Sequence, residues 1–388
     1  MDKKTMKLKN YLDQLRYFYR IFSIRGSLLR RLSRLRRAAG EMRSASPTPS
    51  LPVRLQVETT DICNLKCTMC AREVLPNMNT GYMALEQFEK LIEAASPYYV
   101  TLNGLGEPLT DKSIFDKLSM LHDKLIITSM PTNGTFVFGD RLTNLAKHLP
   151  DRLCFSIDGG KKDTFEKIRR QGDFTKIIEN YKNLSALRSQ GKTRKNQSIY
   201  ILMALQKINM HDYQEMFTLY ESMTGVDSIS LIPVTDYGVE GESLDVCPSK
   251  EEVLILHKEI ENSIANSTSE NEKAFFKKWK HASSKWLVST ASGSIDAATN
   301  NHACLLPWFS SYVDAKGRVY PCCYLTNSDH VMGNINDEPF EKLWHGETYQ
   351  TFRKQLAEDR PNLSSCRNCP RNDDRRIDLF KKLGPLLP

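Results

Sequence analysis

The sequence lacks any apolar run that approaches the roughly 18–20 residues a helix needs to cross a membrane. It also lacks a secretory signal, because no compact apolar segment follows the lysines near its start. We therefore expect a cytoplasmic protein whose ten cysteines lie in a reducing compartment. In that compartment, closely spaced cysteines are more typical of metal binding than of disulfide bonds.

The chain also lacks excess positive charge outside one segment. Residues 1–43 carry thirteen Lys/Arg and three Asp/Glu, a net charge of +10. Because the whole chain carries +8, the remaining residues together carry −2. A body of that charge has no electrostatic footprint for nucleic acid, and we expect no nucleic-acid partner.

The basic segment 1–43 contains a predicted amphipathic helix at 11–37, in which leucine and phenylalanine recur at helical spacing among arginines. One interpretation is a helix on an anionic membrane surface, which would make the protein peripheral to the inner face of the membrane. The other is a helix packed on the body or on a partner, with solvated arginines. The composition favours neither, and a cleaved organellar presequence is a weaker third interpretation.

The rest of the chain divides by composition. Residues 44–52, rich in proline and serine, are a predicted linker. Strand-like and helix-like segments then alternate six times within 53–248, which predicts a parallel sheet with right-handed crossovers. Six units are too few for the closed eight-stranded barrel. The predicted fold is therefore α/β, an open partial (βα)6 barrel, with a helical connector at 249–303 and a small cysteine-rich domain at 304–388. The predicted strands are 53–59, 98–103, 125–130, 152–157, 199–205 and 227–233, and the predicted helices are 84–95, 111–121, 140–148, 161–170, 174–189, 210–223 and 249–264.

Three cysteines follow the first predicted strand at a C-x3-C-x2-C spacing: Cys63, Cys67 and Cys70. A loop leaving a strand can direct three such sulfurs toward one point. Three thiolates hold a [4Fe-4S] cluster and leave its fourth iron without a protein ligand. A structural zinc ion would need a fourth protein ligand, and a catalytic one an activated water. The ligand count favours the cluster over zinc or structural thiols.

This spacing resembles that of the radical SAM superfamily, and residues 53–235 resemble its partial barrel. The resemblance implies that S-adenosylmethionine (SAM) chelates the open iron through its amino and carboxylate groups. One electron, from a partner such as flavodoxin or ferredoxin, would then cleave SAM to a 5′-deoxyadenosyl radical that takes a hydrogen atom from the substrate. Met69 stands where the superfamily usually has an aromatic residue, and methionine can still pack on adenine.

Further matches to the superfamily imply other SAM contacts. Residues 103–108 resemble its GGEP motif, with Leu105 in place of the first glycine. By that match, the segment that contains Gly106 and Glu107 would receive the SAM amino group. Taken alone, the same residues form an ordinary Gly-Pro turn.

Residues 154–188 resemble the superfamily's fourth βα unit. The match implies that Ser156 reaches the SAM ribose region and that Arg169 binds the SAM carboxylate, which suits the planar fork of arginine. Taken alone, Arg169 is a solvated residue at a helix end, and Arg170 could serve as well.

Four later cysteines form a second group. They follow the pattern C-x12-G-x4-C and then C-x2-C: Cys304, Cys322, Cys366 and Cys369. Four thiols saturate one [4Fe-4S] cluster or one zinc ion, and the ligands alone favour neither. Cys323 could replace Cys322, although the spacing favours Cys322. Cys154, Cys247 and Cys323 are then ordinary thiols.

The second group resembles the SPASM/twitch extension of radical SAM enzymes, including Gly333-Asn334-Ile335. Full SPASM domains have seven cysteines and two auxiliary clusters, but this chain has no cysteine after Cys369. The resemblance therefore implies a single auxiliary [4Fe-4S] cluster, as in an aminocyclitol-oxidising member. By analogy, the chain is an oxidoreductase that removes two electrons from a sugar or cyclitol alcohol, with the auxiliary cluster as electron acceptor.

Several alternatives stay open at this point. Many SPASM enzymes modify peptides or proteins, and the basic helix suits a lipid or lipid-linked glycan substrate. A zinc-binding scaffold on a membrane is the alternative without catalysis. Asp236 and Tyr237, which follow the sixth predicted strand, are candidates for a substrate loop.

Overall fold

The computed structural model describes residues 46, 48–73, 75, 80–195, 197–235, 244–288, 304, 306–326, 330–363, 366 and 369. The predicted helix at 11–37 and the predicted substrate loop at Asp236 and Tyr237 lie outside these residues. Among the described residues, no helix is both long enough and apolar enough to span a bilayer.

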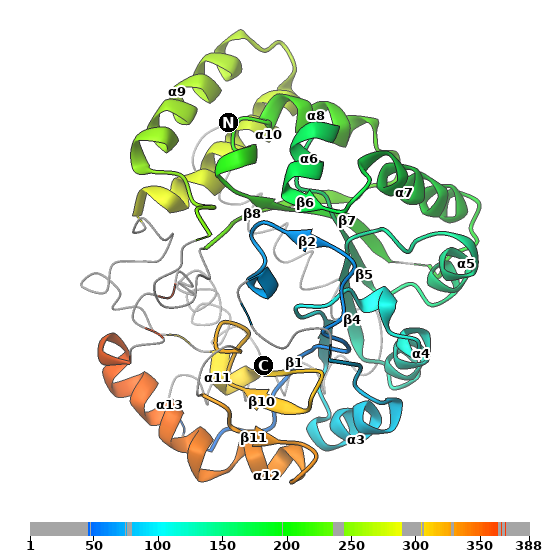
Figure 1. Ribbon diagram of the computed structural model, residues 1–388, viewed down its shortest axis with the longest axis vertical. Coiled ribbons are helices and arrows are strands. Elements are labelled where there is room, and N and C mark those ends of the chain that lie inside the picture. The colour runs from blue at the N-terminus through cyan, green and yellow to red at the C-terminus, as the bar shows by residue number, and fades with distance from the viewer. Residues whose placement is uncertain are drawn as a thin grey trace, which may run out of the picture.

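The six predicted strands form the body of one sheet, all parallel to their neighbours. The six helical segments predicted between and after these strands, 84–95 to 210–223, are present and lie outside the arc of strands (Figure 1). The prediction of an open α/β barrel is thus confirmed. The strands are β1 (Arg54–Val57), β3 (Tyr99–Leu102), β4 (Ile127–Thr132), β5 (Arg152–Ser156), β7 (Ser198–Leu205) and β8 (Ser228–Pro233), and the helices are α3 (Leu85–Ala95), α4 (Ile114–Asp123), α5 (Gly139–Lys147), α6 (Lys162–Ile168), α7 (Phe174–Ser189) and α8 (Tyr213–Ser222).

Two further helices, α9 (Lys250–Asn266) and α10 (Glu270–Ser283), follow β8 and pack against each other. Helix α9 begins with a capping box in which the Ser249 hydroxyl accepts from the Glu252 amide and the Glu252 carboxylate accepts from the Ser249 amide. This satisfies two amide groups that the first helical turn leaves unpaired. The helix predicted over 249–264 is therefore present as α9, and it begins directly after Ser249.

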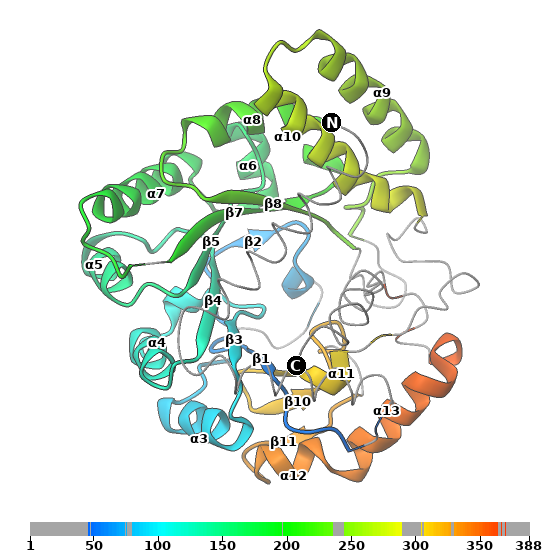
Figure 2. The ribbon, with the colours of Figure 1, turned by 180° about the vertical axis from the view of Figure 1, so that it is seen from behind.

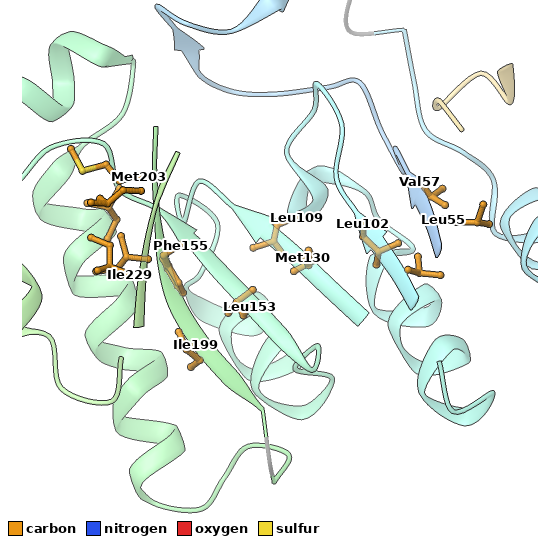
Figure 3. Packing of buried hydrophobic residues seen from close by; sticks show 14 of the residues in the cluster. Leu55, Val57, Leu102, Leu109, Met130, Leu153, Phe155, Ile199, Met203 and Ile229 are labelled. Atoms are coloured by element: carbon orange, nitrogen blue, oxygen red, sulfur yellow. The ribbon is translucent and has the colours of Figure 1, made fainter. Parts of the chain in front are cut away.

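The two faces of the sheet differ in burial. Along β7, Ile199, Ile201 and Met203 are fully buried, whereas the alternate residues are half-buried. Because side chains alternate across a strand, one face packs under the helices and the other faces the barrel interior. Figure 3 shows the buried face as a row of apolar side chains that runs from Leu55 on β1 to Ile229 on β8. The interior face is left free to form a site.

The C-terminal region extends the same sheet. Strand β9 (Ser310–Val313) pairs in parallel with β1, and the hairpin partner β10 (Arg318–Tyr320) continues antiparallel to β11 (Gly333–Asn334). The turn at 314–318 joins β9 and β10 into a hairpin. The nine strands have the order β11-β10-β9-β1-β3-β4-β5-β7-β8. Helices α11 (Leu306–Phe309), α12 (Phe340–Trp344) and α13 (Glu347–Asp359) complete this region beside β1 (Figure 2).

The C-terminal region also holds part of the predicted linker. The indole of Trp308 donates to the Ser46 carbonyl at 2.7 Å, and that of Trp344 donates to the Ser50 carbonyl at 3.0 Å. Arg353 supports this contact, because its buried guanidinium lies 4.2 Å from the centres of the Trp344 and Tyr349 rings. The segment just before the barrel is therefore bound to the C-terminal region of the chain.

One predicted helix is too long at its end. The sequence predicts a helix over 161–170, but α6 ends at Ile168, and Arg169–Arg170 form strand β6. Strand β6 pairs with β2 (Lys66–Cys67), so that Cys67 lies opposite Arg169. The helix stops because these two residues exchange helical hydrogen bonds for bonds to the cysteine loop.

Candidate functional site

The loop that carries the first three cysteines lies inside the arc of strands (Figure 1). Besides the β2–β6 pair, the Thr68 amide donates to the Ile168 carbonyl at 2.9 Å. The chain then turns back, because the Cys70 amide donates to the Cys67 carbonyl at 3.1 Å. These bonds fix a loop that has little regular structure of its own.

The three cysteines meet at a cavity of about 390 Å³, here called the central cavity. Its wall includes every SAM-contact residue that the sequence predicts. Its lining residues include Gln56, Cys63, Cys67, Met69, Cys70, Leu105, Gly106, Glu107, Asn133, Ser156, Arg169, Tyr312, Cys323 and Tyr324. Residues from the first four predicted strands and from the C-terminal region thus meet at one place.

The thiols of this loop are poor anions without a bound cation. Burial raises the pKa of Cys63 and of Cys70, and it raises the pKa of Cys67 to about 12. Repulsion by Cys63 also raises the pKa of Cys67 and of Cys70, and Cys70 adds to the shift of Cys67. Only a strongly cationic group would hold three thiolates together here. The donor set therefore fits an iron–sulfur cluster.

The described residues contain no group of three or more His, Cys, Asp or Glu side chains arranged around a single metal ion. A zinc site would bring its ligands to bonding distance of one atom, about 2.3 Å for sulfur. A cluster instead spreads its thiolates over separate iron atoms.

Glu107 organises the cavity wall. Its carboxylate accepts hydrogen bonds from the Thr132 hydroxyl at 2.7 Å, the Asn133 amide at 2.7 Å and the Leu109 amide at 3.1 Å. Burial raises the pKa of this carboxyl group, and the Asn133 and Thr132 bonds oppose that shift. Glu107 therefore joins the segment after β3 to the end of β4. A direct contact between Glu107 and SAM would come in addition to these hydrogen bonds.

Gly106 allows this segment to pack against the cysteine loop. A Cβ atom at this position would lie 2.1 Å from the Thr60 carbonyl oxygen, which is part of the backbone. The Glu107 amide also donates to the Ile62 carbonyl at 2.8 Å. A side chain larger than hydrogen at residue 106 would therefore push the Gly-Glu-Pro segment away from the loop.

Arg169 is held by a residue that the sequence did not single out. Its Nε atom lies 2.7 Å from Asp158 Oδ2 in a buried ion pair, and its Nη1 donates to Cys67 Sγ at 3.8 Å. Asp158 also accepts from the Ala204 amide at 2.7 Å. Arg169 is thus a buried cation beside a cluster thiol, and the prediction that it binds a carboxylate stays a prediction.

Asn133, which directly follows β4, supplies a second hydrogen-bond donor to the cysteines. The Asn133 side-chain amide lies 3.8 Å from Cys63 Sγ and 3.0 Å from Asn64 Oδ1. By itself, the Thr132-Asn133-Gly134 segment indicates only a turn. Its position at a strand end next to the cysteine loop was the available signal.

The four cysteines of the second group come together at another place. Burial and the nearby Cys323, Cys304 and Cys369 raise the pKa of the Cys322 thiol. Burial, Cys304 and Cys369 likewise raise the pKa of Cys366 to about 12. The four predicted ligands are therefore close enough to repel one another as thiolates. The set Cys304, Cys322, Cys366 and Cys369 fits one cluster, and we call its location the auxiliary site.

Adjacent residues face the two sites. Cys322 interacts with the cysteines of the auxiliary site, whereas Cys323 and Tyr324 line the central cavity. The two cysteines are neighbours in the chain. That Cys322 and not Cys323 is the fourth thiol of the auxiliary site stays a prediction from the spacing.

Comparison with known families supports this picture. A profile of the radical SAM superfamily matches residues 57–220, and a profile of the SPASM iron-sulfur cluster-binding domain matches residues 304–370. The two matches contain the first three cysteines and the last four, respectively.

Characterised relatives have several activities. The chain is 29% identical to GTP 3′,8-cyclase of Desulforamulus reducens over 189 residues. This aligned stretch covers 46% of this chain and 55% of that enzyme. The cyclase of Clostridium botulinum strain Okra is 26% identical over 305 residues, 74% of this chain and 89% of that one. The S-adenosyl-L-methionine-dependent 2-deoxy-scyllo-inosamine dehydrogenase of Niallia circulans is 33% identical over 88 residues, 21% of this chain and 35% of that one.

Solved structures share the fold. SuiB of Streptococcus suis, bound to its precursor peptide SuiA, superposes with a TM-score of 0.59 at 15% identity, over 92% of this chain and 79% of that one. At this identity the likeness establishes the fold alone. The two family matches identify the chain as a member of the radical SAM superfamily, an enzyme that uses SAM and iron–sulfur clusters and carries a C-terminal SPASM domain.

Proposed function

We propose that this enzyme oxidises a hydroxyl-bearing carbon of a sugar or cyclitol to a carbonyl, and that the auxiliary cluster accepts one of the two electrons. The observation that carries the proposal is the position of Cys322 and Cys323. A substrate in the central cavity that touches Cys323 would lie one residue away from a ligand of the auxiliary site. Short distances of this kind suit electron transfer from a substrate radical.

The cysteines divide between the two clusters. Cys63, Cys67 and Cys70 would hold the cluster that binds SAM, and Cys304, Cys322, Cys366 and Cys369 would hold the auxiliary one. When bound, the SAM cluster supplies a 5′-deoxyadenosyl radical that accepts a hydrogen atom, and the auxiliary cluster supplies a one-electron acceptor. Because four thiols saturate the auxiliary cluster, we assign it electron transfer rather than substrate ligation.

The chain's own groups position the reactants. Ser156 would face the SAM ribose region, Met69 would pack on adenine and the segment of Gly106 and Glu107 would receive the amino group. Arg169, held by Asp158, places a positive charge beside the cluster thiols and the predicted carboxylate position. This charge would favour both the thiolates and the SAM carboxylate.

The relative from Niallia circulans supports the reaction class, since it is an S-adenosyl-L-methionine-dependent 2-deoxy-scyllo-inosamine dehydrogenase. A peptide substrate is the second candidate, because SuiB shares the fold over most of the chain and was solved with a precursor peptide. The predicted membrane contact through 11–37, and with it a lipid or lipid-linked glycan substrate, stays a prediction that deletion of residues 1–43 and liposome binding would test.

The test begins with anaerobically reconstituted protein. Two clusters predict roughly eight irons per chain, and a Cys366→Ala, Cys369→Ala variant should keep about four. We expect wild type to convert 2-deoxy-scyllo-inosamine, or another polyol in a screen, to a ketone with one 5′-deoxyadenosine each. The double variant should still form 5′-deoxyadenosine but lose the ketone. Ketone formation at the wild-type rate without the auxiliary cluster, or turnover of precursor-like peptides alone, would contradict the proposal.

A further inference from the structure

The proposed oxidation requires a group that accepts a proton, and this inference rests on that proposed function. Converting an alcohol carbon to a carbonyl removes one hydrogen from carbon as an atom, one from oxygen as a proton, and one electron. The two cofactors account for the hydrogen atom and the electron. The proton must pass to a group of the protein that the substrate can reach.

One buried pair beside the central cavity meets this requirement. Tyr312 lines the cavity and is 2% exposed, and burial and the nearby Glu58 carboxyl group raise the pKa of its hydroxyl. Tyr312 belongs to β9 and Glu58 follows β1, and these neighbouring strands are parallel, with Gln56 opposite Tyr312. Gln56 and Glu58 therefore share the face of β1 that looks toward the cavity.

The Glu58 carboxyl group is fixed in place by the backbone. One oxygen accepts from the Leu105 amide at 2.6 Å, and the other accepts from the Ala315 amide at 3.2 Å. Gly104 leaves room for it, because a Cβ atom there would lie 2.3 Å from Glu58 Oε1. Neither bond comes from a cationic side chain, and among the described residues Glu58 forms no ion pair of the kind that normally keeps a buried carboxylate charged.

The surroundings of Glu58 bring the pKa of its carboxyl group close to neutral pH. Burial raises its pKa to about 7, its two backbone bonds oppose the shift, and Asp314 and Asp61 add to it. Asp314 itself is paired with Arg318 at 2.6 Å. A general base works best when its pKa lies near the operating pH. The titratable and charged groups that act on the Glu58–Tyr312 pair are Asp61, Asp314, Arg318, Tyr320 and Cys323.

We propose that Tyr312 contacts the substrate hydroxyl and passes its proton to Glu58, which makes the pair the proton acceptor of the oxidation. The substrate O–H bond breaks as the Tyr312 oxygen takes the proton, and the Tyr312 O–H bond breaks as the Glu58 oxygen takes its own. The substrate keeps both electrons of the O–H bond, one of which leaves to the auxiliary cluster as the carbonyl forms. Proton and electron thus depart through adjacent parts of the C-terminal region, Tyr312 and Cys322.

The test uses Tyr312→Phe and Glu58→Gln in the reconstituted full-length enzyme, with 2-deoxy-scyllo-inosamine as probe. Tyr320→Phe is the matched control, because Tyr320 is a buried tyrosine in the same hairpin whose ring lies 6.2 Å from that of Tyr312. Iron content, cluster EPR spectra and the Kd for SAM report on structure. Ketone per 5′-deoxyadenosine and the pH profile of kcat report on proton transfer.

We expect both test variants to keep their clusters and SAM affinity while ketone per 5′-deoxyadenosine falls about 10²-fold, the lower end of general-base effects. The wild-type rate should rise through about pH 7, and Glu58→Gln should lose this dependence. Test variants that match Tyr320→Phe in yield and pH profile would overturn the inference alone. A wild-type rate that is flat between about pH 6 and 8.5 would also overturn it, even if the variants failed to fold. Absence of any ketone from wild type would overturn the proposed function, and this inference with it.

Discussion

Replacing Asp158 by Asn should weaken both the fold and the cluster environment. The change keeps the size of the side chain and an oxygen for the Ala204 amide, but it removes the negative charge 2.7 Å from Arg169 Nε. Asp158 is fully buried and Arg169 is 9% exposed, so water cannot replace the lost partner. Leaving one member of a buried ion pair unpaired costs about 3–5 kcal/mol.

Part of that cost should be recovered in the loaded enzyme, because Arg169 also donates to Cys67 Sγ. We therefore expect a loss of about 3 kcal/mol in the free energy of unfolding, measured by anaerobic urea titration. We also expect a higher Kd for SAM and an altered EPR spectrum of the reduced cluster, since the guanidinium is no longer held.

The control is Glu86→Gln, which removes the carboxylate of an exposed i,i+4 pair with Lys90. Solvent already screens that pair, and no measurable change is expected. If Asp158→Asn unfolds at the urea concentration of Glu86→Gln and keeps the wild-type spectrum, then Arg169 does not depend on Asp158 and the reasoning is wrong.

Gly106→Ala should lower iron incorporation and SAM binding, because its Cβ would collide with the Thr60 carbonyl; iron content and Kd equal to wild type would contradict this. Glu58, whose folded pKa is raised from 4.5 to about 7, should contribute stability that is fully present below about pH 4.5 and is lost as the pH rises through 7. Urea titrations at several pH values should show that decline in wild type and not in Glu58→Gln. Arg353→Leu should destabilise the C-terminal region by about 2–4 kcal/mol, because two buried carbonyls lose a charged donor, and limited proteolysis should then cut there first.

The repeating part of the fold was predictable because its signals are local. Each of the six predicted strands overlaps an observed one within a few residues, since the outward face of each strand is aliphatic and turn residues bound it. The three loop cysteines were predictable for the same reason, because their ligand spacing lies within eight consecutive residues.

Long-range pairings were not predictable from those signals. The β2–β6 pair joins residues about a hundred positions apart and is only two residues long, so no periodicity marks it. Asp158 was predictable as a site residue, because it lies two residues after Ser156 and side-chain alternation places both on one face of the strand end. Tyr312 and Glu58 had no such signal, because their proximity depends on the parallel pairing of β9 with β1.

The pairing of β9 with β1 has a consequence for how the protein is made. Strand β1 emerges from the ribosome about 250 residues before β9, its second neighbour in the sheet. At ordinary translation rates this delay is roughly 10–50 s. During that interval β1 has one edge without hydrogen-bond partners, and such edges recruit strands from other chains. Nascent or truncated chains that end after α10 should therefore self-associate or require a chaperone.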